Sequence, residues 1–215
     1  MAKPDAGLTG RFQLASAPAG LRLAQDLVNT AVSAKAGDPD ADHLADIGTA
    51  RAWLREALVH WADATGAAAV PEVELEEADL ARLSEFREAL RERLRASSDN
   101  AGPAPSAGPG PRERAADIRL SVMPDGRIEY QPLGVGAGAV AALVTMESLL
   151  AQTAGTLTRL KTCAHPVCGV CFYDTSPNRS RSWHDTKTCG NINNLRASRA
   201  RRRSGGGDPV AAGAV

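Results

Sequence analysis

The sequence contains no apolar run long enough to cross a membrane as a helix, and its first residues do not form a recognisable targeting segment. These two absences exclude a membrane-spanning helix and predict a cytoplasmic protein without a membrane partner. Net charge is absent as well, because 25 Lys and Arg residues balance 25 Asp and Glu residues. Any affinity for a polyanion must therefore come from the distribution of charge along the chain.

Recognisable catalytic constellations are also missing, since neither a Ser/His/Asp arrangement nor a paired-carboxylate arrangement stands out. We therefore expect that the protein is not an enzyme. Cysteine is scarce: the chain has four, all between positions 163 and 189. A disulfide scaffold is not expected, because such small scaffolds belong to secreted proteins. Nothing in the sequence indicates the helix N-terminus that would activate a redox pair at Cys168-Gly-Val-Cys171.

The cysteine segment has the ligand types and spacing of a zinc site. Zinc prefers four tetrahedral thiolate and imidazole ligands, usually supplied as two close pairs joined by a loop. Cys163 with Cys168 and His184 with Cys189 form two such pairs, each with four residues between its members. Four protein ligands leave no open position for water, so the zinc would be structural.

A second ligand set stays open at this point. Cys171 could replace His184, which would make an all-thiolate site with Cys163, Cys168 and Cys189. We favour the set with His184 because it forms two symmetric pairs. His165 is expected to be a bystander, although it could compete as a ligand.

Positive charge is concentrated at the C-terminal end. Residues 159–203 are strongly basic, and Asp174 and Asp185 are the only acidic residues among them. Residues 72–92, by contrast, are rich in acids. Six arginines are candidates for contacts with double-stranded DNA, two in the finger loop and four on a predicted helix after Cys189: Arg179, Arg181, Arg196, Arg199, Arg202 and Arg203. A solubilising basic tail is the alternative interpretation.

The same segment resembles the CGNR zinc-finger family. The matching positions are Cys163, Cys168, Phe172, Asp174, Ser176, Asn178, Arg181, Trp183 and Cys189-Gly190-Asn191. Two positions depart from the family pattern, because His184 stands for a cysteine and Ile192 stands for the closing arginine. The resemblance implies a bacterial transcription regulator with a structural zinc. Asp174 and Trp183 are expected to support the site by bonding a ligand or covering it, and ordinary loop packing is the alternative for both.

The rest of the chain reads as mainly helical. Helical spacing of apolar residues predicts helices over 21–34, 49–66, 76–96 and 137–154, with Thr49 as the N-cap of the second. Alternation over 118–122 and 128–130 around Pro124-Asp-Gly126 predicts a β-hairpin, and Arg11–Leu14 could form a short strand. Residues 97–111 read as a flexible loop and 204–215 as a disordered tail.

The fold class predicted is therefore mainly α with a small β-hairpin, plus a C-terminal zinc finger of two ligand pairs followed by a basic helix. The predicted domains are 1–160, which would be regulatory, and 161–203, the finger with its basic helix.

A second resemblance lies in the first helix. Leu23-Ala-Gln-Asp-Leu-Val-Asn-Thr30 is similar to the stretch that opens the ABATE domain, which accompanies CGNR fingers. This resemblance implies a regulatory or ligand-sensing domain in a stress response, with Asp26, Asn29 and Thr30 as candidates for an effector pocket. The alternative is that these polar groups cap the helix or bond nearby backbone.

Other functions stay open. A homodimer is compatible with the sequence. The rival functions are a thiol-redox sensor that releases zinc, a protein-interaction adaptor and, least favoured, a zinc enzyme.

Overall fold

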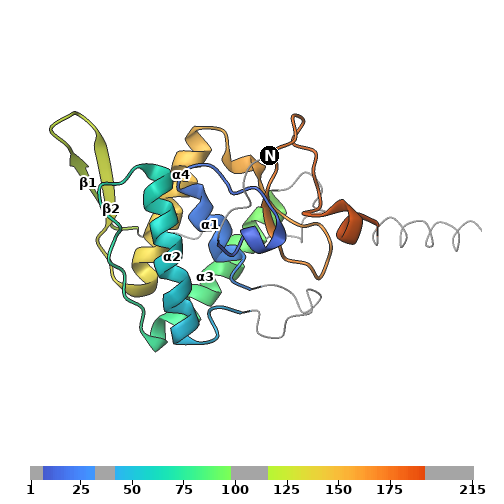
Figure 1. Ribbon diagram of the computed structural model, residues 1–215, viewed down its shortest axis with the longest axis horizontal. Helices are drawn as coiled ribbons and strands as arrows, with labels where there is room; N and C mark the ends of the chain where they lie inside the picture. Colours follow the sequence, from blue (N-terminus) through green and yellow to red (C-terminus); the bar gives the residue numbers. More distant parts are fainter. Residues whose placement is uncertain (1–6, 32–41, 98–115, 192–215) are drawn as a thin grey trace, which may run out of the picture.

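The structure is a computed structural model that describes residues 7–31, 42–97 and 116–191. Four α-helices form most of it, and two small antiparallel hairpins complete it (Figure 1). The elements are η1 (Gly10–Phe12), α1 (Leu21–Val28), α2 (Ile47–Thr65), α3 (Glu77–Ala96), β1 (Ile118–Val122), β2 (Ile128–Pro132), α4 (Gly136–Thr153), η3 (Leu157–Arg159), β3 (Leu160–Thr162), β4 (Cys171–Tyr173) and η4 (Thr186–Gly190). The predicted fold class, mainly α with a hairpin and a C-terminal finger, is confirmed.

Helix α1 lies at the centre of the domain. All eight of its residues are buried, and it packs against α2, α3, α4 and strand β4. It ends at Val28, six residues earlier than predicted, because the chain turns at Asn29 and the Thr30 hydroxyl donates to the Leu27 carbonyl at 2.7 Å. The short strand predicted for Arg11–Leu14 is also wrong, since this segment contains the 3₁₀ turn η1.

Helix α2 buries the apolar stripe that its spacing predicts. Trp53, Leu58 and Trp61 are among its buried residues, and Gly66 ends the helix with a φ of 68°. The N-cap is Asp46 and not Thr49, because the Asp46 carboxylate accepts the Thr49 N–H at 2.9 Å.

One carboxylate organises the starts of α3 and α4. Asp79 accepts the Glu76 N–H at 2.9 Å and the Ala137 N–H at 3.0 Å. The neighbouring Gly136 has a φ of +55°, and a Cβ there would lie 2.2 Å from the Asp79 carboxylate. Only glycine therefore fits between the two helices at this point.

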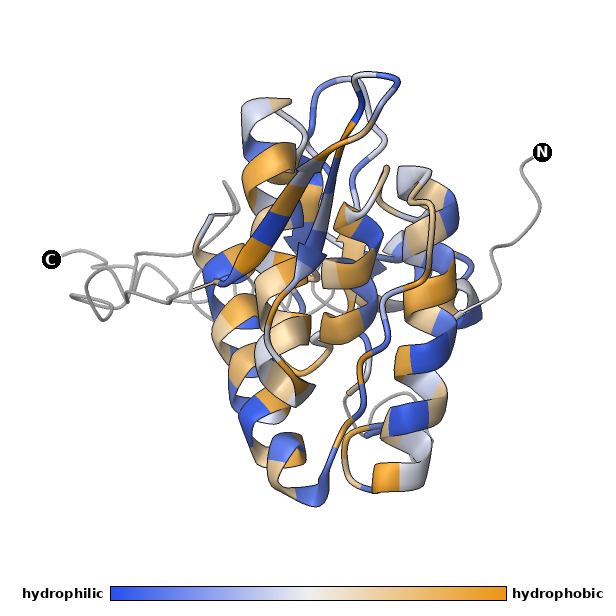
Figure 2. Ribbon diagram, turned by 90° about the vertical axis from the view of Figure 1, so that its left-hand side faces the viewer, coloured by the Kyte–Doolittle hydropathy of each residue, from blue (hydrophilic) through white to orange (hydrophobic). Residues whose placement is uncertain are grey.

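The two hairpins lie at opposite ends of the molecule (Figure 1). Hairpin β1–β2 turns at Pro124-Asp-Gly126 as predicted, and it is anchored where Tyr130 packs edge-on against Trp61. Three apolar side chains of this hairpin, Leu120, Val122 and Ile128, are exposed. Figure 2, coloured by hydropathy, shows hydrophobic positions along the hairpin ribbon. The second hairpin, β3–β4, was not predicted and leads directly into the cysteine segment.

Some predictions fall outside the described residues. These are the flexible loop apart from Ser97, the tail over 204–215, Ile192, and the basic-helix arginines at 196, 199, 202 and 203. In the described part of the chain, no helix has both the length and the apolar character needed to span a membrane.

Candidate metal centre

The finger is built from the β3–β4 hairpin, the loop after it and the turn η4. Cys163 directly follows β3, and its N–H donates to the Val170 carbonyl at 2.8 Å. The Cys168 N–H donates to the His165 carbonyl at 3.0 Å, and Gly169, with a φ of 69°, returns the chain to β4. This knuckle directs the first pair of thiols to one side of the hairpin.

The second ligand pair comes from the end of the loop. His184 lies just before Asp185, whose carboxylate caps η4 by accepting the Lys187 N–H at 2.8 Å. Cys189 lies within η4 and is buried. The cap therefore sets the direction in which the turn presents Cys189 towards the knuckle.

The four donor atoms of Cys163, Cys168, His184 and Cys189 all lie within 4.8 Å of one another. The Cys168 sulfur is 3.3 Å from Nδ1 of His184, which identifies Nδ1 as the ligand atom. Tetrahedral zinc with bonds of about 2.3 Å to sulfur and about 2.0 Å to nitrogen needs donors roughly 3.5–3.8 Å apart. The donor set therefore fits zinc, and donors within 4.8 Å of one another reach this spacing by shifts of about 1 Å or less.

The close approach of the cysteine sulfurs shifts the pKa values of their thiols. A hydrogen bond from Cys168 is the main reason why the pKa of Cys163 is lowered to about 3, with help from the His184 side chain and from the N–H groups of His165 and His184. Hydrogen bonding to Cys163 and burial raise the pKa of Cys168, and burial together with the Cys163 charge raises that of Cys189. Three thiolates can be ionised together only beside a cation, which zinc would supply.

Cys171 lies outside the donor group. Its side chain is fully buried in the main helical core, and this burial raises its pKa. The structure therefore brings together the set with His184 and does not assemble the all-thiolate alternative. His165 is buried beside the knuckle but does not join the four donors, as expected for a bystander.

Apolar side chains cover the donors. Leu14, Val170 and Phe172 pack with the three cysteines in a cluster separate from the main core, and Phe12 and Trp183 close it from outside. The Phe12 ring meets the His184 ring edge-on, with centroids 6.3 Å apart. Trp183 thus covers the site as the sequence suggested, whereas the contribution of the N-terminal segment was missed.

The contacts of Asp174 favour the alternative interpretation, which is packing within the loop. Asp174 bonds no ligand but accepts from Lys161 Nζ at 3.0 Å, from the Ser176 N–H and hydroxyl at 2.9 and 2.6 Å, and from the Arg181 N–H at 2.9 Å. Burial opposes its ionisation, but these hydrogen bonds outweigh burial and lower the pKa of Asp174 to about 2. The carboxylate shapes the loop that carries His184.

The two loop arginines differ in whether their guanidinium groups are used in internal bonds. The Arg181 guanidinium donates to the carbonyls of Trp183 and His184 and lies over the Phe172 ring at 5.3 Å. It therefore braces the ligand loop from within. Arg179 is exposed, with a φ of 53° and a weak bond to the Thr158 hydroxyl at 3.3 Å.

The residues predicted for an effector pocket are used in internal bonds. Asp26 accepts from the Thr9 hydroxyl at 2.5 Å, and burial is the main cause that raises the pKa of Asp26. Asn29 bonds the backbone of Cys171, and Thr30 accepts from the Arg87 guanidinium at 3.0 Å. The structure favours the alternative interpretation, in which these groups bond neighbouring parts of the fold.

A helical domain that carries a buried finger with a Cys₃His donor set defines a two-part, metal-binding protein. Residues 21–162 match the ABATE family, described as "Putative stress-induced transcription regulator", and residues 159–202 match the CGNR zinc finger. The chain therefore belongs to the ABATE family, and its C-terminal segment is a CGNR zinc finger. A search of curated proteins found no match. The family and the donor set together indicate a bound metal, for which zinc fits best.

Proposed function

We propose that this protein is a DNA-binding transcription regulator in which zinc is structural and the helical domain is regulatory. The observation that supports this most is the complete donor set, because three thiols and one imidazole satisfy a tetrahedral ion without leaving a position for substrate or water. The site thus favours a scaffold over an enzyme. The two family matches support a regulator of transcription.

Charge supports DNA as the partner. Between positions 159 and 203 the sequence has ten Lys and Arg residues against two acids. Asp174 pairs with Lys161, and Asp185 caps η4, so both acids are occupied within the finger. Exposed Arg179 is therefore available to phosphates, and the arginines at 196, 199, 201, 202 and 203 add to the positive charge of the sequence at this end.

The test is binding of duplex DNA by the zinc-loaded chain over a range of salt concentrations. We expect log Kd to change with log salt with a slope of about 0.9 per phosphate neutralised. Arg199→Ala and Arg202→Ala should each weaken binding and lower this slope by about one. Arg119→Ala, at an exposed position on the distant hairpin β1–β2, is the matched control and should leave binding unchanged. Absent or salt-insensitive binding would favour the protein-interaction adaptor.

The thiol-redox sensor is less well supported by the structure. A switch between Cys168 and Cys171 needs both sulfurs accessible, yet Cys171 is fully buried among helical-core residues. A homodimer remains a prediction that the contacts in one chain do not address.

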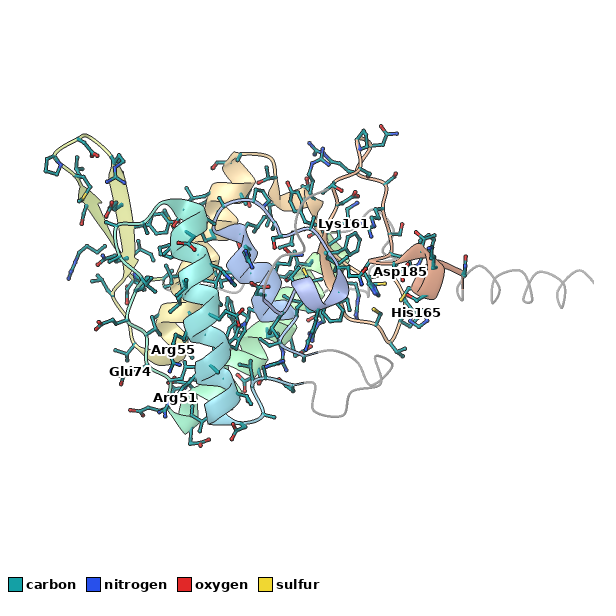
Figure 3. The ribbon with its side chains drawn as sticks, viewed as in Figure 1. Arg51, Arg55, Glu74, Lys161, His165 and Asp185 are labelled. Carbon is teal, nitrogen blue, oxygen red and sulfur yellow. The ribbon has the colours of Figure 1, made fainter. Side chains whose placement is uncertain are left out.

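We infer that an effector of the regulatory domain binds at a different site from the one expected. A groove of about 1270 Å³ lies between α2, α3 and the start of α4, and Figure 3 shows Arg51, Arg55 and Glu74 there, away from Lys161, His165 and Asp185 of the finger. Arg55 and Arg82 line it without a hydrogen bond or ion pair to any described residue. Glu72, Glu74, Glu76 and Asp79 line the same groove, so its charge is mixed. We infer that Arg55→Ala would abolish any stabilisation that a small-molecule library gives in a thermal-shift screen.

A further inference from the structure

The N-terminal segment reaches the finger before the helical domain begins. Leu14 is buried in the same cluster as the three ligand cysteines, and Phe12 packs on its outer side. Arg11, whose guanidinium lies over the neighbouring Phe12 ring at 4.9 Å, donates to the Asn29 carbonyl at 2.7 Å. The segment therefore contacts the end of α1 as well as the finger. Residues 12 and 14 precede both family matches, which begin at 21 and 159.

Asn29 joins the helical domain to the finger by a two-point contact. Its Nδ2 donates to the Cys171 carbonyl at 3.0 Å, and its Oδ1 accepts the Cys171 N–H at 2.8 Å. The side chain is completely buried and also donates to the Thr9 hydroxyl at 3.3 Å. An amide that satisfies both backbone groups of one residue fixes the position of β4, because unmaking either bond would leave a buried polar atom unpaired.

Strand β4 transmits this contact to the ligands. Cys171 and Tyr173 face the helical core, whereas Phe172 between them belongs to the metal-site cluster. Near this contact, Arg91 of α3 donates to the Val28 and Ala31 carbonyls at 2.7 and 3.1 Å and lies against Gly169 of the knuckle. The metal site is thus enclosed by elements far away in the sequence.

We propose that the helical domain is part of the zinc site's scaffold: Phe12 and Leu14 shield the ligands, and Asn29 is a positioning residue that holds the hairpin carrying them. Metal binding contributes directly to folding where the ligands are not held without the ion. Since the finger folds against α1, the free energy of metal binding is shared with the helical domain. The coupling is reciprocal, so zinc stabilises the helices and the helices retain zinc. The proposal rests on the metal-binding part of the proposed function and not on DNA binding.

The first experiment measures zinc release from the full-length, zinc-loaded chain to an excess of a metallochromic chelator. Phe12→Ala should release zinc about tenfold faster than the wild type, in line with the effect of losing groups that support ligands. Asn29→Asp keeps the acceptor for the Cys171 N–H but places an oxygen against the Cys171 carbonyl, and it should act in the same direction. Leu120→Ala, which removes an exposed apolar side chain on the distant hairpin, is the control and should release zinc at the wild-type rate.

The second experiment follows helix melting by circular dichroism with and without the chelator. We expect zinc removal to lower the Tm of the helical signal in the wild type and to lower it less in Asn29→Asp, because the contact that couples the two parts is weakened. If Asn29→Asp does not fold, Phe12→Ala carries the release test alone, because its half-buried side chain lies outside the helical core.

Two outcomes would overturn the proposal. A Phe12→Ala variant that binds one zinc and releases it at the wild-type rate would show that the N-terminal segment does not shield the ligands. A helical Tm that is unchanged by zinc would show that the domains are independent. Either result leaves the proposed function intact, whereas a chain that binds no zinc at all would contradict both.

Discussion

At the scale of single residues, the ligand set follows from the direction in which β4 turns its side chains. Successive residues of a strand point to opposite faces. Phe172 faces the metal-site cluster, so Cys171 must face the helical core, although it lies in a CxxC with Cys168. Spacing alone could not choose between Cys171 and His184. A strand assignment for residues 171–173 would have made the choice.

This assignment predicts opposite effects for two substitutions. His184→Ala removes one of four donors, so the chain should lose its zinc or bind it far more weakly. Cys171→Ala removes a buried sulfur from the helical core and should cost about 1 kcal/mol of stability while zinc content stays at one per chain. Metal analysis of both purified variants is the measurement. The reverse pattern would show that Cys171 is the fourth ligand.

The charge of Asp174 is predicted to stabilise the fold in a pH-dependent way. Asp174→Asn keeps the shape but replaces an acceptor by a donor that faces either Lys161 and the Arg181 N–H or the Ser176 N–H, so it should cost about 2 kcal/mol. Because the pKa of Asp174 is lowered in the folded state, its charge contributes fully to stability above the unfolded-state pKa of about 3.9. This contribution is lost as the pH falls towards the folded-state pKa of about 2.

The stability difference between wild type and Asp174→Asn should therefore stay constant from pH 8 to pH 5. Urea unfolding of the zinc-loaded proteins at several pH values measures it. A difference that already shrinks at pH 6 would mean that the carboxylate titrates at a raised pKa.

At the scale of elements, local sequence predicted where helices occur better than where they begin and end. Gly66 ends α2 as expected, because a glycine adopts the left-handed conformation easily. The start of α2 was placed three residues late, since Asp46 and Thr49 are both good capping residues and only the fold selects one. The end of α1 depends on Thr30, whose hydroxyl is fixed by Leu27 and by Arg87 of another helix.

Asp79 is the element-scale residue with the largest expected effect. Asp79→Ala removes an acceptor from the starts of α3 and α4 together, so it should lower the free energy of unfolding by about 2 kcal/mol. Asp46→Ala removes the cap of α2 alone and should cost about half as much. Urea unfolding compares the two, and equal losses would contradict the double role of Asp79.

At the scale of the whole molecule, the sequence indicated two parts but not how they are joined. The four ligand residues lie within a stretch of 27 residues, so the spacing of the metal site can be recognised from local sequence. Asn29 and Cys171 are 142 positions apart, and no periodicity or spacing connects them. The same distance explains why Asp26, Asn29 and Thr30 resembled a pocket: polar residues on a buried helix look alike whether they face a ligand or another strand.

The central claim is that one zinc ion is held by three sulfurs and one imidazole nitrogen. X-ray absorption at the zinc edge of the chain purified without added metal tests it most directly. We predict one zinc per chain with three sulfurs at about 2.3 Å and one nitrogen at about 2.0 Å. A shell of four sulfurs, a shell dominated by oxygen, or a protein without zinc would contradict the account.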